Sequence, residues 1–233
     1  MMCGNATLLE RNHSIGHSGI RRFAIKETAN IAEPCTITLM FTSTFMLFFV
    51  LAAPLQEAKP VIDNNRVSVR EVRIPALSER KGKPLTIGTR GDDVVAIDLD
   101  GTTGYYVPKG TTHPMPKHGI VIELKNVSVP PLENKTKYPL AFPRPDVKKV
   151  LENDRVIIWD YTWTPGKPTP MHFHDKDVVV VYLADGELKS TTPEGKVDVN
   201  PISFGLTKFN RPNRSHTEEV VKGSARAIIV ELK

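Results

Sequence analysis

From about residue 59 onward, the pattern of hydrophobic and polar positions is that of β-strands. Residues 65–74 alternate polar and apolar side chains, as a strand with one buried face does. Three further runs are almost continuously apolar, which is typical of strands covered on both faces: 154–163, 178–186 and 225–233. Only residues 146–154 predict a short helix. The pattern therefore predicts an all-β chain.

The same pattern occurs twice along the chain. Three segments of the first half resemble three of the second half in the same order: 64–77 and 153–166, 91–101 and 176–186, 118–125 and 225–233. Valine-rich strands can look alike by chance, but agreement at three ordered places predicts a duplicated domain. The proline-rich segment 130–145 marks the boundary, so we expect domains at 59–135 and 136–233.

The first 58 residues have a different composition. No charged residue occurs between Glu33 and Glu57, and an apolar core spans 37–53. Val50 and Ala52 fit the small-residue cleavage pattern of a signal peptide. The alternative is a membrane anchor, since the uncharged stretch approaches the ~20 residues that span a bilayer. We expect residues 1–58 to be a poorly ordered region, and the protein to be exported (periplasmic or secreted) or anchored to the membrane by this segment alone.

Composition and charge narrow the function classes. The chain is 40% hydrophobic and 24% charged, which excludes a wholly disordered protein. Its formal net charge of +5 is spread without a basic block, so no nucleic-acid partner is expected. Both cysteines, Cys3 and Cys35, precede the predicted cleavage site. A cleaved chain would therefore have neither a disulfide nor a cysteine nucleophile.

His172 and His174 are the main candidates for chemistry. They are one residue apart, so on a strand both side chains face the same side. On their own they could simply be solvent-facing strand residues. A metal site needs at least one more ligand from another strand, and His216 is the only histidine further along the same repeat.

The spacing of Gly166, His172, His174 and Gly186 resembles the first motif of the cupin family. His216, after a proline-containing turn, resembles the histidine of the second motif. The resemblance implies two cupin-like antiparallel β-barrels of the double-stranded β-helix, or jelly-roll, type. It also implies one divalent transition metal, which could be Fe, Mn, Ni, Zn or Cu, held by the three histidines.

The chain departs from the cupin pattern at the glutamate of the first motif. That position falls at Val179, which cannot bind a metal. Glu218 lies two residues after His216, so it could contact a metal ligand or replace the missing carboxylate. Arg214, on the same turn, could bind an anionic substrate.

The first repeat lacks the metal motif. At the positions of the two histidines and the glutamate it has Ile87, Thr89 and Val94. His113 follows a turn that matches the second motif, but we expect it to be a polar residue without a metal role. The metal site is therefore expected only in the second domain of a two-domain cupin.

Two function classes follow from the resemblance. The first is a metal-dependent enzyme that acts on a small molecule, either a three-histidine dioxygenase or a Lewis-acid isomerase or lyase. No catalytic residue can be assigned for it. The second is a non-catalytic module that binds a metal or a small ligand. Exposed sheet edges also make a homodimer possible.

Overall fold

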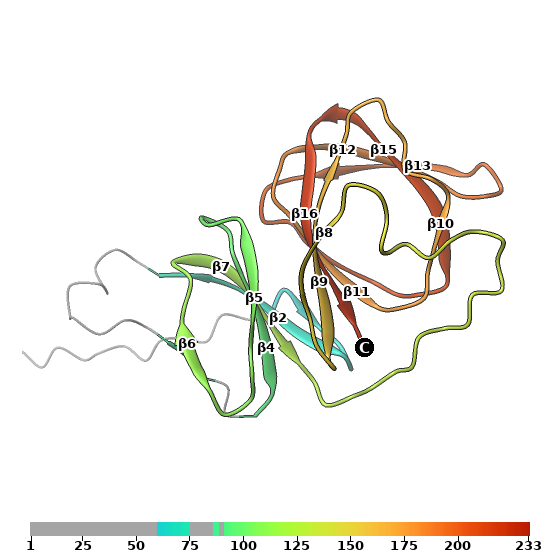
Figure 1. Cartoon of the computed structure of the whole chain (residues 1–233). Coiled ribbons are helices and arrows are strands. Elements are labelled where there is room, and N and C mark those ends of the chain that lie inside the picture. The colour runs from blue at the N-terminus through green and yellow to red at the C-terminus, as the bar shows by residue number, and fades with distance from the viewer. Residues whose placement is uncertain (1–59, 75–85, 89–90) are drawn as a thin grey trace, which may run out of the picture. The chain divides into compact units, whose positions relative to one another are not determined.

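The computed structural model describes residues 60–74, 86–88 and 91–233. The predicted signal or anchor segment, with its apolar core at 37–53, lies outside these residues. In the described part of the chain every regular element is a β-strand (Figure 1). A helix able to cross a membrane is not found among these residues. The predicted all-β fold is confirmed.

Strands β1–β7 belong to the first repeat and strands β8–β16 to the second. Their bounds are β1 (Ile62–Asp63), β2 (Val67–Arg73), β3 (Thr86–Gly88), β4 (Asp93–Asp98), β5 (Thr103–Val107), β6 (Thr112–Pro114), β7 (His118–Leu124), β8 (Lys148–Glu152), β9 (Val156–Trp163), β10 (His172–His174), β11 (Val178–Tyr182), β12 (Gly186–Thr191), β13 (Val197–Ile202), β14 (Thr207–Asn210), β15 (Arg214–Gly223) and β16 (Ala225–Leu232).

The predicted helix at 146–154 is not formed. These residues contain strand β8, which pairs antiparallel with β9 at the edge of a sheet. Val150 and Leu151 pack against the large apolar core. Pairing with β9 and burial of these two side chains outweigh the weak local preference for a helix.

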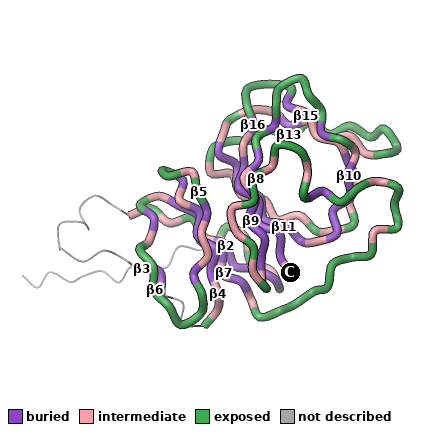
Figure 2. The backbone as a smooth tube through the Cα atoms, viewed as in Figure 1, coloured by how far each residue is buried: buried purple, intermediate pink, exposed green. Residues whose placement is uncertain are grey.

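The second repeat forms two antiparallel sheets, as in a jelly-roll barrel. One has the strand order β14-β11-β16-β9-β8 and the other the order β10-β15-β12-β13. A buried cluster joins them: Ile157, Trp159, Tyr161, Val178, Val180 and Tyr182 from the first sheet pack with Leu188, Ile202 and Val220 from the second. Figure 2 shows that the buried positions follow the strands, whereas most of the segment between β7 and β8 is exposed.

The first repeat forms a five-stranded antiparallel sheet, in the order β1-β2-β7-β4-β5, and the two-stranded pair β3-β6. Ile87 of β3 packs with residues of the larger sheet, among them Val94 and Val121. This is a smaller version of the two-layer arrangement seen in the second repeat.

The two repeats have the same central strand order. Strands β2-β7-β4 are adjacent in one sheet, and their counterparts β9-β16-β11 are adjacent in the other. Val67 lies opposite Leu124, and Val156 lies opposite Leu232, which preserves the sequence alignment of these strands. For β4 and β11 the alignment shifts by one residue, because Val94 pairs with Glu123 and Val178 pairs with Glu231. The two halves thus share a central strand order, and the duplication stays a prediction.

Two ion pairs connect the repeats, and each repeat provides the arginine of one pair and the aspartate of the other. Arg66 of the first repeat pairs with Asp177 of the second at 3.4 Å, and Arg155 of the second pairs with Asp93 of the first at 2.9 Å. The same arginines donate to equivalent backbone oxygens at 3.2 and 3.1 Å, those of Lys233 and Lys125. The contacts of one repeat thus mirror those of the other.

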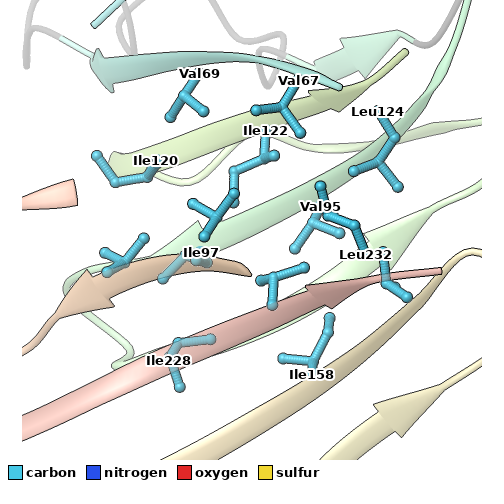
Figure 3. Packing of buried hydrophobic residues seen from close by; sticks show 14 of the residues in the cluster. Val67, Val69, Val95, Ile97, Ile120, Ile122, Leu124, Ile158, Ile228 and Leu232 are labelled. Atoms are coloured by element: carbon cyan, nitrogen blue, oxygen red, sulfur yellow. The ribbon is translucent and has the colours of Figure 1, made fainter. Parts of the chain in front are cut away.

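The largest apolar core lies between the two five-stranded sheets. Figure 3 shows aliphatic side chains of both repeats meeting there, such as Val95 and Ile122 from the first and Ile158 and Ile228 from the second. Val179 of β11 belongs to the same cluster and is fully buried. The side chains on one face of β11 therefore pack between the repeats. Those on the opposite face point into the interior of the second repeat.

Candidate metal centre

Strands β10 and β15 bring the three predicted histidines together. The strands pair antiparallel with His172 directly opposite His216, and His174 extends to the same side as His172. The three side chains are buried, and one ring nitrogen of each lies within 4.8 Å of the others. The structure therefore places the predicted ligands in one cluster.

Hydrogen bonds orient the imidazoles for metal binding. Nδ1 of His172 donates to the carbonyl oxygen of Pro170 at 2.8 Å, which leaves its Nε2 as the free lone pair. That buried Nε2 has no hydrogen-bond partner. Nε2 of His174 and Nε2 of His216 are 3.1 Å apart, close to the ~3 Å that separates neighbouring ligands bound to one ion at about 2.1 Å. The donor set fits a transition metal.

Burial keeps the histidines neutral. It lowers the pKa of His172 to about 4, with a smaller contribution from the positive charge of Arg144 and an opposing one from Glu218. Burial also lowers the pKa of His174 well below its ordinary value, and Arg214 adds to the effect. The pKa of His216 is lowered by burial too. Neutral imidazoles are the form that binds metals.

The side chains of β11 that face the histidines differ from the one predicted. Val178 and Val180 line the cavity beside His174, whereas Val179 faces the core between the repeats. Placing the cupin glutamate at residue 179 was therefore wrong, because successive residues of a strand point to opposite faces. Both residues on the histidine side are valines, so β11 still offers no carboxylate.

Glu218 brings a carboxylate close to His216. Its Oε1 is 3.7 Å from Nε2 of His216, and its Oε2 accepts hydrogen bonds from Nε1 of Trp163 at 3.1 Å and from Arg144 at 3.4 Å. Burial opposes its ionisation, but the charges of Arg144, His216 and His172 and the hydrogen bond from Trp163 lower its pKa to about 2. Glu218 is thus an ionised group at the site.

Arg214 also lies at the site. It is opposite His174 in the β10–β15 pairing, and burial lowers the pKa of its guanidinium. Its Nε donates to the carbonyl oxygen of Arg211 at 2.7 Å. The side chain lines the cavity beside His174, together with Tyr182 and Asn210. It is therefore placed to contact an anion bound near the histidines.

Sequence reasoning missed Arg144, which comes from the segment before β8. Backbone hydrogen bonds hold this segment against β10, from Phe173 to Pro139 and from Ala141 to Phe173, both at 2.8 Å. The Arg144 guanidinium lies 4.0 Å from the ring centre of Tyr161, and its side chain is 6% exposed. No local motif marks an arginine in a proline-rich loop, so only the tertiary contacts could have found it.

Two of the cavities at the site share lining residues: Tyr182, Asn210, Arg214 and Glu218. The smaller, inner cavity beside His174 has a volume of about 30 Å³, room for about two water molecules. A wider cavity of about 220 Å³ contacts His216, Arg214 and Glu218 and also contains Ser190 and Lys208. The inner cavity suits an ion with its waters, and the outer one suits a small molecule.

The first repeat has no equivalent site among the described residues. Ile87 pairs with His113 in the β3–β6 pair, as His172 pairs with His216 in the second repeat. The ring of His113 is exposed and lies 4.3 Å from that of Tyr105. Ile87 cannot bind a metal, as the sequence predicted. Thr89 lies outside the described residues.

Comparisons with known proteins place this geometry in a family. The chain is 34% identical to the beta-alanine degradation protein BauB of Pseudomonas aeruginosa over 79 residues, which are 34% of this chain and 80% of BauB. The chain belongs to the cupin superfamily. No family model matches it.

Solved cupin structures resemble parts of the chain. A cupin domain of Bordetella pertussis is 25% identical, covers 42% of this chain and 98% of its own length, and has a TM-score of 0.35. A cupin 2 conserved barrel domain protein from Leptotrichia buccalis is 13% identical, covers 75% of this chain and 87% of its own length, and has a TM-score of 0.40.

Proposed function

We propose that this cupin is a metal-dependent enzyme that acts on a small anionic molecule. The metal would be one divalent transition ion held by His172, His174 and His216. The observation that carries the proposal is the buried Nε2 of His172, which has no hydrogen-bond partner and lies in a cluster of three neutral imidazoles. When bound, such an ion supplies Lewis-acid or redox chemistry, as isomerases, lyases and dioxygenases require.

The residues around the histidines support an anionic substrate. Arg214 lines both cavities, and Lys208 lines the outer one. A guanidinium binds a carboxylate strongly, because its two parallel N–H groups match the two oxygens. Asn210 and Tyr182 add polar atoms along the same wall. These groups would orient a small acid with one end toward the histidines.

A second candidate is a non-catalytic module that binds a metal or a small ligand. The small volume of the inner cavity favours it, because about 30 Å³ leaves little room for a reacting group beside an ion. Under this reading the outer cavity holds the ligand and no bond is changed.

Metal analysis of the purified chain tests the proposal. We expect about one transition metal per chain, lost in His172→Ala and kept in the matched control His113→Ala, which alters the exposed counterpart in the first repeat. Turnover of small carboxylic acids, screened by oxygen uptake and product analysis, separates the enzyme from the binding module. A chain that binds no transition metal would refute the enzyme and the metal-binding module, and would leave only a module that binds a small ligand.

We also propose export of the protein through the apolar segment at 37–53. Sequencing the N-terminus of the protein recovered outside the cytoplasm tests this, with a start near Ala53 as the expected result. An intact N-terminus on protein that stays with the membrane would indicate the anchor instead.

A further inference from the structure

Glu218 divides its two oxygens between different neighbours. Both donors, Trp163 and Arg144, bind Oε2. Oε1 lies 3.7 Å from Nε2 of His216. A carboxylate held at one oxygen while the other faces a histidine cluster has the arrangement of a metal ligand that is fixed by its surroundings.

We propose that Glu218 is a fourth metal ligand, through Oε1, and that strand β15 thereby provides the carboxylate that β11 lacks. The inference rests on the proposed metal site. Neighbouring ligands of one ion lie about 3 Å apart when each is ~2.1 Å from it. A shift of less than about 1 Å brings Oε1 from 3.7 Å to that distance from Nε2 of His216.

The strand positions explain why Glu218 can replace the missing residue. Side chains two residues apart on a strand point to the same side, so Glu218 extends beside His216. On β11, the residues facing this side are Val178 and Val180, whose apolar side chains leave the space beside the histidines without another carboxylate. The ligand set would then be three histidines and one glutamate drawn from two strands.

A role for Glu218 only as the counterion of Arg144 does not account for the positions of both carboxylate oxygens. A carboxylate that served only as the counterion of Arg144 would gain most by offering both oxygens to the guanidinium. Here Arg144 contacts one oxygen at 3.4 Å, and its Nε is buried without a partner. Arg144 and Trp163 are therefore positioning residues, which fix the direction of Oε1.

A fourth ligand that carries a negative charge would change the attraction of the bound ion for an anionic substrate. With three neutral histidines a divalent ion keeps a charge of about +2, whereas an added carboxylate lowers it to about +1. Attraction of an anionic substrate then depends more on Arg214 than on the ion. We expect a small acid bound through its carboxylate to Arg214, with a neutral group facing the metal.

Cobalt binding to the full chain tests the ligand assignment. Co²⁺ is titrated into the unmodified chain and into Glu218→Gln, with absorption spectra in the visible range and the dissociation constant as readouts. We expect Glu218→Gln to bind Co²⁺ at least ~10-fold more weakly and to show a changed spectrum. The matched control is Glu219→Gln, since Glu219 pairs with Lys189 and should bind as the unmodified chain does.

The failures of the two proposals are distinguishable. If His172→Ala abolishes Co²⁺ binding but Glu218→Gln keeps both the spectrum and the affinity, Glu218 is not a ligand and the three-histidine site stands. If the unmodified chain binds no metal, the metal site itself is refuted.

A second measurement does not depend on the folding of any variant. Infrared difference spectra record the carboxylate stretching bands of the unmodified chain before and after Zn²⁺ is added. A shifted carboxylate band on metal binding is the expected result. A difference spectrum without any carboxylate change would overturn the assignment.

Discussion

A glutamate at residue 179 tests which face of β11 points toward the proposed metal site. Aligned with the cupin motif, Val179→Glu would restore the missing ligand. In the structure Val179 is 0% exposed and packs in the core between the repeats. The substitution would therefore place a carboxylate among aliphatic side chains, with no cation or hydrogen-bond donor to receive it.

The expected cost has two parts. Removing a fully buried valine loses roughly 1.5–3 kcal/mol of hydrophobic stabilisation. Leaving a carboxyl group buried without partners adds a few kcal/mol, whether it is charged or takes up a proton. The sum of at least ~4 kcal/mol is a large fraction of the ~5–15 kcal/mol that stabilises a typical protein.

Val178→Glu is the matched control. Val178 is 1% exposed, so the same apolar burial is lost, but it lines the cavity with His174 and Arg214. A carboxylate there can meet a cation, and we expect it to be less destabilising by several kcal/mol and to strengthen metal binding. Urea unfolding at pH 7 and Zn²⁺ titration give the two readouts. The reasoning is refuted if Val179→Glu is as stable as Val178→Glu, or binds Zn²⁺ more tightly.

Three further predictions concern stability, measured as the free energy of unfolding in urea. Arg66→Ala should lower the free energy of unfolding by about 3–5 kcal/mol, because it leaves the buried Asp177 without its main partner. Arg155→Ala should lower it by less, because the pair of Arg155 with Asp93 is more exposed. Equal losses in the two variants would contradict this difference in burial. Burial raises the pKa of Glu231 above its ordinary 4.5, so the folded chain holds that proton more tightly and stability falls as the pH rises from about 4.5 through the raised pKa. Glu231→Gln should then be more stable than the unmodified chain at pH 7 but not at pH 4, and a gain at both pH values would be inconsistent with the titration. Gly186→Ala should be severely destabilising because its Cβ would lie 2.4 Å from the backbone oxygen of Ser224, whereas Gly166→Ala, with φ +71° and open space, should cost only about 1–2 kcal/mol; the reverse order would argue against the observed backbone.

Local pattern was sufficient for most strands and for the histidine pair of β10. The apolar runs became β9, β11 and β16, and the alternating segment became β2. The histidine pair was recognisable because residues two apart on a strand face the same side. The spacing of this pair from Gly166 and Gly186 matched the cupin motif. The helix at 146–154 was wrong because its sequence is short and weakly biased, so pairing with β9 decided its conformation.

The sequence by itself determined an all-β chain and the pair His172 and His174, since these depend on periodicity and spacing within single strands. Which face of β11 meets the histidines was decided by the packing of the two repeats, because a shift of one residue exchanges the core face for the site face. The neighbours of Glu218 were likewise decided by tertiary structure. Arg144 and Trp163 come from separate segments, and only the folded chain brings both to one carboxylate oxygen.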